Sequence, residues 1–215
     1  MTKPSPDLFA TAETEIRSGD FARAIGRLQG AIPSLPAAEQ RRAHRLAGLA
    51  QYFQRKFAEA LPHFLAAAEG TEVPEDHFNV AMTQAKLGKL DEAEAAWQAC
   101  FDLSYKHQQA PETTTFFEKK ALFAGELLEA GRPGGLAIDL LERQLLPFFT
   151  NYHVTDPSFW AMRGVPALEI VLKLLRRAYK DSGRSEADWA ELCHRVADEV
   201  DSEGGDLCRA YASYD

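Results

Sequence analysis

The amino-acid sequence predicts an all-α protein built as a solenoid of helical hairpins. Three segments align without gaps: "SGDFARAIGRL" at 18–28, "QRKFAEALPHF" at 54–64 and "LGKLDEAEAAW" at 87–97. Their leading apolar residues, Phe21, Phe57 and Leu90, recur after 36 and 33 residues, the spacing of stacked supersecondary units. No alternating apolar pattern elsewhere in the chain predicts a β-strand.

Each copy predicts two helices joined by a turn. A small residue precedes the turn at a constant offset, an alanine follows it, and a large apolar residue closes the copy. We expect the small residues to let the paired helices approach closely, and the large ones to fill the wider gap toward the neighbouring unit. These sets are Ala12, Gly48 and Ala81, then Ala24, Ala60 and Ala93, then Leu28, Phe64 and Trp97.

This pattern resembles the tetratricopeptide repeat (TPR) family, whose units of about 34 residues are each a helix, a turn and a helix. Gly19 and Gly88 stand at the family's turn, and Pro36 stands where a unit often ends in proline. The resemblance implies a right-handed solenoid. It covers about residues 8 to 131 and concerns packing residues, so it implies the fold more strongly than the function.

A degenerate fourth copy sets the expected domain boundaries. "EKKALFAGELLEAGRPGG" places Ala124 and Gly131 at the repeat offset, but Pro133 and the following glycines interrupt the pattern. We therefore predict a flexible tail at 1–7, the solenoid at 8–131 and a cap of carboxy-terminal helices at 132–215. Pro62 departs from the repeat, because a proline inside its helix would kink it unless the helix starts late.

The carboxy-terminal third predicts three further helices. Residues 136–149 are apolar on nearly every side, as in a helix between layers. Pro166 opens a second, strongly amphipathic helix with Leu168, Leu172, Leu175 and Tyr179 along one stripe. A third spans 185–200, where Ser185 and Asp188 fit a capping box and Trp189, Leu192, Val196 and Val200 form the apolar face.

Composition and charge narrow the classes of function. The chain has 215 residues, a net charge of -8 and a pI near 5.3, so its field opposes a nucleic-acid partner. The amino terminus lacks the pattern of a secretory signal, and no apolar run reaches the roughly 18 residues of a membrane helix. We expect a cytoplasmic protein without membrane insertion. Its cysteines, Cys100, Cys193 and Cys208, form no CxxC pair and are expected to be buried thiols.

No motif predicts catalysis, a cofactor or a metal. The glycines of "GRPGGLAID" lack the lysine and hydroxyl residue of a phosphate loop, so a helix-breaking turn is favoured over a phosphate site. The six histidines include no HxxxH or HExxH pair. Cys193 and His194 are helix neighbours about 100° apart, which opposes a nucleophile and base pair.

The resemblance also implies where a partner binds, since the first helices of such units line a concave groove for a peptide or partner helix. Some family members grip a terminal carboxylate there, but Phe9, Glu13, Leu46, Glu75 and Asn79 stand at those places, so that clamp is absent. We predict instead that the arginines bind an acidic or mixed acidic and apolar segment. The groove positions in the second and third units are Arg42, Arg45, Leu49, Tyr52, Phe78, Asn79, Met82 and Lys86.

A second candidate surface is the basic stripe of the helix after Pro166: Lys173, Arg176, Arg177 and Lys180. Residues 163–184 contain six Lys or Arg and two Asp or Glu, a balance of about +4 in an acidic chain. A solvated face is the favoured interpretation, an acidic protein partner the next, and nucleic acid or a membrane surface the last.

Together these features predict a non-enzymatic protein–protein interaction scaffold, an adaptor or chaperone-like protein. Two alternatives stay open. One is an accessory subunit of an enzyme system, whose carboxy-terminal helices touch a catalytic partner. The other is an enzyme with its site between the solenoid and those helices. The sequence leaves the partner's identity and homo-oligomerisation open.

Overall fold

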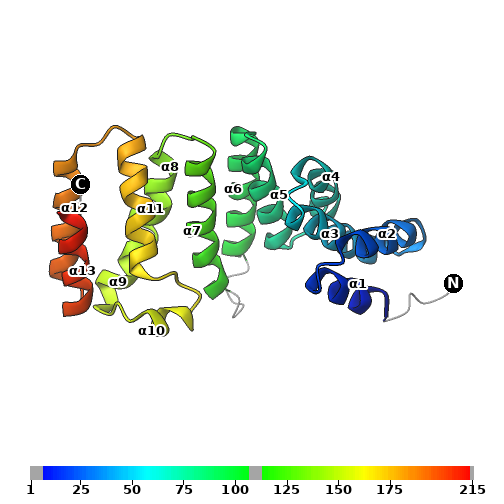
Figure 1. The fold of residues 1–215 in the computed structure, drawn as a ribbon, viewed down its shortest axis with the longest axis horizontal. Helices are drawn as coiled ribbons and strands as arrows, with labels where there is room; N and C mark the ends of the chain where they lie inside the picture. The colour runs from blue at the N-terminus through cyan, green and yellow to red at the C-terminus, as the bar shows by residue number, and fades with distance from the viewer. Residues whose placement is uncertain (1–6, 107–112, 214–215) are drawn as a thin grey trace. The chain divides into compact units, whose positions relative to one another are not determined.

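The computed structural model describes residues 7–106 and 113–213 and is helical apart from turns and short connections (Figure 1). No β-strand occurs in these two ranges, which confirms the all-α prediction for them. The predicted flexible tail lies outside the described residues except for Asp7, which begins the first helix.

The chain divides into two compact units, Met1–Lys106 and His107–Asp215. This division differs from the predicted boundary at residue 131. The helix that carries the faint fourth copy, α7 (Thr113–Glu129), falls in the second unit.

The first unit, from blue to green in Figure 1, contains three consecutive helical hairpins. Its elements are α1 (Asp7–Arg17), α2 (Phe21–Ala31), the 3₁₀ turn η1 (Ile32–Ser34), α3 (Ala37–Phe53), α4 (Phe57–Ala68), α5 (Pro74–Lys86) and α6 (Leu90–Lys106). Within the hairpins α1 packs on α2, α3 on α4 and α5 on α6. Between them α2 packs on α3 and α4 on α5. Each aligned copy is therefore one two-helix unit that contacts its neighbours in sequence.

The hairpin turns share one backbone conformation. Gly19, Arg55 and Gly88 occupy equivalent positions and have positive φ angles of 83°, 61° and 71°. Glycine adopts this left-handed conformation without a steric penalty, which explains its recurrence in the first and third copies. Arg55 bears the strain that glycine avoids.

The predicted small and large positions form the core of the first unit. All five alanines of the small sets are fully buried, and Leu28, Phe64 and Trp97 are buried with them. A Cβ atom added at Gly48 would lie 2.8 Å from the Cδ1 and Cε1 atoms of Phe64. The close approach of α3 to α4 thus depends on the missing side chain, as the repeat alignment predicts.

Replacing Gly48 by leucine should lower the free energy of unfolding by about 1–3 kcal/mol, because the new side chain must displace the Phe64 ring. Chemical denaturation followed by circular dichroism measures the change. Gly26→Ala is the matched control, since Gly26 lies in α2 and a Cβ there meets nothing within 4 Å. Equal midpoints for Gly48→Leu and the wild type would contradict the close contact.

Pro62 lies inside its helix, so the late start that would have accommodated it does not occur. α4 begins at Phe57 and continues through Pro62, whose side chain is exposed. The helix loses one backbone N–H donor there but keeps its amphipathic face, since Ala60, Leu61 and Phe64 remain buried.

The second unit, from green to red in Figure 1, contains α7, α8 (Gly135–Ile138), the π-helical segment η2 (Asp139–Arg143), α9 (Leu146–Tyr152), α10 (Pro157–Ala161), α11 (Leu168–Asp181), α12 (Glu186–Glu199) and α13 (Ser202–Ala212). α11 packs on α7, α8 and η2, and α12 pairs with α13. The single helix predicted at 136–149 is wrong, because the π-helical segment and Pro147 at the start of α9 break it into three pieces.

The two following helices agree with the sequence. Leu168, Leu172, Leu175 and Tyr179 are buried along α11, and the Ser185 and Asp188 capping box begins α12. Sequence reasoning missed α13, whose cap Asp201 accepts hydrogen bonds from the backbone N–H groups of Gly204 and Thr155.

Candidate partner-binding surfaces

The predicted groove residues lie on two first helices of successive hairpins. Arg42, Arg45, Leu49 and Tyr52 follow one another along α3, and Phe78, Asn79, Met82 and Lys86 along α5. Spacings of three or four residues place the α3 set on one helical face, and they do the same for Asn79, Met82 and Lys86 on α5, where Phe78 directly precedes Asn79. The contacts of their side chains decide which of them could meet a partner.

Arg45 is already bound within the chain, so the hypothesis that it holds a partner's carboxylate is replaced by a structural role. Its Nε atom donates to Asp76 Oδ1 at 2.5 Å, and its Nη2 atom donates to Asp76 Oδ2 at 2.7 Å. Asp76 is 0% exposed. The hydrogen bonds to Asp76 raise the pKa of Arg45 above its usual value. This bidentate pair joins α3 to α5.

Arg42 makes the corresponding link from α3 to α1. Its Nη2 atom lies 2.8 Å from Glu13 Oε1, and its guanidinium lies over the Phe9 ring at 4.4 Å from the centroid. Both members of the ion pair are partly exposed, so a partner's carboxylate can compete with Glu13 for the guanidinium.

Three groove residues contribute mainly to packing. Tyr52 lies edge-on to the rings of Phe57 and Phe64, with centroids 5.1 and 6.3 Å away. Leu49 packs against the core of the first unit, and Phe78 lies edge-on to Trp97 at 6.2 Å. These half-buried side chains offer a partner only their exposed edges.

Asn79, Met82 and Lys86 form the stripe of α5 that remains accessible. Asn79 and Met82 are half-buried, and Lys86 is exposed in the last turn of the helix. The structure thus keeps part of the predicted groove as a candidate surface, centred on α5.

The basic stripe of α11 is largely neutralised within the second unit. Lys173 pairs with Glu169 at 2.7 Å, and Arg176 lies 3.7 Å from Glu186. Arg177 binds Glu129 and the backbone oxygen of Leu128. Lys180 is exposed. These pairs favour the solvated-face interpretation over a docking surface.

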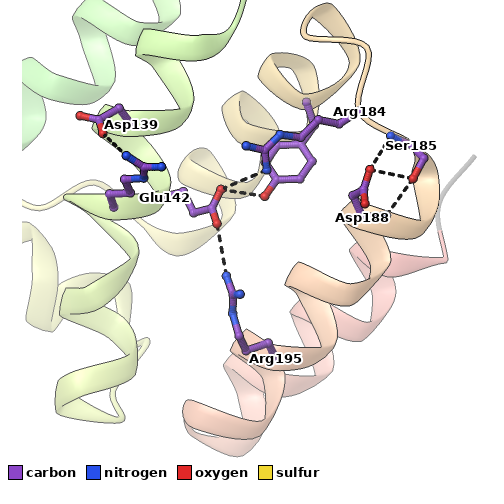
Figure 2. Close-up of polar contacts among 8 residues, drawn as sticks. Asp139, Glu142, Arg184, Ser185, Asp188 and Arg195 are labelled. Carbon is purple, nitrogen blue, oxygen red and sulfur yellow. Dashed lines mark hydrogen bonds and ion pairs between the residues drawn. The ribbon is translucent and has the colours of Figure 1, made fainter.

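Glu142, which no sequence motif marks, lies at the centre of a polar network (Figure 2). The Tyr179 hydroxyl donates to its carboxylate at 2.7 Å, and Arg195 donates to it at 3.2 Å. Arg184 lies 3.9 Å from the same carboxylate and stacks over the Tyr179 ring. Burial and the bond to Glu142 raise the pKa of Tyr179 to about 12. The network ties η2 to α11 and α12, so we assign it a structural role.

The cysteines and one buried amine bear on possible chemistry. Burial raises the pKa of Cys193 to about 12 and that of Cys208 to about 11, which suppresses thiolate formation. His194 beside Cys193 is exposed. Burial lowers the pKa of Lys120 on α7 to about 8, although the charge of Asp139 opposes the shift.

Two histidines in the first unit form a pair that sequence spacing did not reveal. The Nδ1 atoms of His44 on α3 and His63 on α4 lie 2.9 Å apart. Gln29 on α2 lies 3.3 Å from the other ring nitrogen of His63. A short contact between two ring nitrogens requires one to donate and the other to accept, so the acceptor ring is uncharged.

Acidification should therefore destabilise the first unit. Burial lowers the pKa of both rings, and the charge of His44 lowers that of His63 further. An unfolded histidine titrates near 6.5, so the unfolded chain binds more protons below that pH. The part of the unfolding free energy that comes from the uncharged His44–His63 pair is therefore present above about pH 6.5 and is lost as the pH falls below it. Thermal midpoints between about pH 7.5 and about pH 5.5 test this, and His63→Gln should flatten the slope. An equal slope in the variant would assign the loss to other groups.

A scan of protein-family models finds no match to this sequence, and a search of curated proteins finds no significant relative. Among residues 7–106 and 113–213, no helix has the length and apolar character needed to cross a membrane. In the same ranges, no cluster of three or more His, Cys, Asp or Glu side chains is arranged to hold a metal ion.

Proposed function

We propose that this protein is a non-enzymatic interaction scaffold that binds a segment of a partner protein along the first helices of its repeats. In this proposal the hairpins form a right-handed TPR-like solenoid in a cytoplasmic adaptor or chaperone-like protein. One observation carries it. Glu13–Arg42 links α1 to α3, and Arg45–Asp76 links α3 to α5, so polar pairs join the three first helices in succession.

The second helices have a separate link, which supports the same order. Gln29 on α2 contacts His63 on α4. Polar contacts thus link first helices to one another, α1 to α3 and α3 to α5, and they link the second helices α2 and α4. That pattern is expected when hairpins stack in parallel and present two distinct faces.

The proposed contact surface is the α5 stripe of Asn79, Met82 and Lys86, extended by the exposed edge of Arg42. Methionine adapts to irregular apolar partners, the amide offers both a donor and acceptors, and the two cations attract carboxylates. We therefore propose a mixed acidic and apolar segment as the partner. The contacts of Arg42 and Arg45 do not test the two alternatives, an accessory subunit of an enzyme system and an enzyme. Both alternatives therefore stay predictions.

The combined variant Met82→Ala with Lys86→Glu tests this function. It should weaken capture of the native partner by about tenfold, since it removes apolar area and reverses one charge. Lys89→Glu makes the same charge change in the turn after α5 and is the control. If both variants lose capture equally, a general charge effect replaces the groove. If neither loses capture, the α5 stripe is not the contact surface.

A further inference from the structure

The repeat alignment relates one buried polar position in all three hairpins. Glu15, Gln51 and Gln84 are equivalent, and each is 9% exposed. Arg27, His63 and Ala96 are likewise equivalent on the following second helices. The first hairpin shows how these two positions relate in space.

In the first hairpin the buried acceptor is filled by a guanidinium. Arg27 Nε donates to Glu15 Oε2 at 3.1 Å, and its Nη2 atom donates to Oε1 at 2.8 Å. The hydrogen bond from Arg27 lowers the pKa of Glu15. An arginine reaching in from the second helix therefore satisfies this position.

In the third hairpin no arginine side chain is available to fill the same position, because Ala96 stands at the place of Arg27. Gln84 Oε1 is buried and has no hydrogen-bond partner among the described residues. A buried acceptor without a partner is costly, so an occupant that donates to it gains binding free energy. Ala96, at the place of Arg27, has no side chain that could donate to Gln84.

Gln84 and Ala96 line a cleft of about 390 Å³ between α4, α5 and α6. Leu65 and Val80 give this cleft an apolar surface, while the carboxylates of Glu69 and Glu92 add negative charge. Leu65 is unusually exposed for a leucine, at 48%. The lining thus suits a long side chain with an apolar stem and a cationic end that donates hydrogen bonds.

We propose that this cleft binds an arginine side chain of a partner protein, its guanidinium donating to Gln84 Oε1 as Arg27 donates to Glu15. The site is distinct from the α3 and α5 stripes, so it stands whether or not that surface binds a partner. Arginine is favoured over lysine because its fork of N–H groups reaches a buried amide oxygen and a rim carboxylate together.

The second hairpin supplies a natural control. Gln51 Oε1 also lacks a partner among the described residues and lines a cleft of about 410 Å³. However, Lys56 and Glu59 line that cleft with opposite charges, whereas the cleft of the third hairpin is lined by two carboxylates and by no lysine or arginine. His63, at the place of Arg27, is already bound to His44 and Gln29. The proposal therefore assigns arginine binding to the third hairpin alone.

The test is an NMR titration of the full-length chain with the peptide acetyl-Gly-Arg-Gly-amide. The peptide should shift the side-chain amide of Gln84 and the backbone amides of Ala95 and Ala96 with a saturable, millimolar affinity. Peptides with citrulline or norleucine in place of arginine should bind at least about tenfold more weakly, because they lack the cation. Equal binding of all three, or shifts spread over the acidic surface, would overturn the proposal.

Three variants locate the site. Gln84→Leu should weaken the arginine peptide by about tenfold, whereas Gln51→Leu should leave it unchanged. Ala96→Arg should block the peptide and raise the thermal midpoint, because the chain then supplies its own guanidinium. Circular dichroism confirms that each variant is folded. The proposal fails if Gln51→Leu weakens binding as much as Gln84→Leu, or if Ala96→Arg still binds the peptide with wild-type affinity.

Discussion

Replacing Arg45 by alanine should lower the free energy of unfolding of the first unit by roughly 3 kcal/mol, because it leaves the carboxylate of Asp76 buried without its cation. Asp76 is fully buried and receives both hydrogen bonds from Arg45. Arg45 itself is partly exposed. We therefore expect a loss at the lower end of the range that is typical when one partner of a buried ion pair is removed. Urea denaturation measures the change.

A double-mutant cycle separates the pair from its parts. Arg45→Met with Asp76→Leu should be more stable than either single variant, because no charge then remains buried. Arg45→Lys is the matched control. It keeps the charge but loses the two-pronged geometry, so it should be intermediate. Additive effects in the cycle would show that Arg45 and Asp76 do not stabilise the unit as a pair.

The second large effect is expected at Trp160 in the second unit. Trp160→Ala should destabilise that unit by about 3–5 kcal/mol, because it opens a large cavity. The ring is buried and lies edge-on to Phe149, Tyr152 and Phe159, with centroids 5.0 to 5.8 Å away. Its Nε1 atom also donates to the backbone oxygen of Val154 at 2.7 Å.

Hydrogen exchange followed by mass spectrometry localises this loss. Protection should fall first in α9, α10 and α11, which lie in the second compact unit together with Trp160, and should persist in α1 to α6 of the first unit. Trp160→Phe is the control, since it keeps most of the apolar area and loses only the N–H donor. Equal loss of protection in both units would mean that they unfold as one cooperative structure.

The hairpins could be predicted because their packing residues repeat. Gly48 faces Phe64, and the equivalent alanines are buried, so the spacing in the sequence reports directly on close contacts. The helix at 136–149 could not be placed from periodicity, because a π-helical segment changes the number of residues per turn. The short helix α13 was missed because its two glycines resemble a loop. A Cβ atom at Gly204 would lie 2.3 Å from Thr155 Cγ2, and one at Gly205 would lie 3.0 Å from the backbone oxygen of Ala197, so both glycines allow close packing.

The candidate surface was predicted only in part, because polar contacts between helices do not recur at a fixed spacing in the sequence. Nothing in the sequence pairs Arg45 with Asp76, 31 residues away, or His44 with His63. One signal was available. Aligning the polar positions of the repeats, as well as the apolar ones, matches Gln84 with Glu15 and Ala96 with Arg27. The third copy keeps a buried acceptor at Gln84 but has alanine in place of the arginine, and this difference points to the cleft of the third hairpin.

Photo-crosslinking from single positions tests the central claim, that a partner segment binds along the first helices. A photoreactive amino acid at Met82 on α5 should yield crosslinks to one partner segment, with acidic and apolar residues identified by mass spectrometry. The same group at the exposed Arg23 on α2 should yield few. Crosslinks of equal yield and identity from both positions, or from Arg23 alone, would contradict the assignment of the binding surface to the first helices.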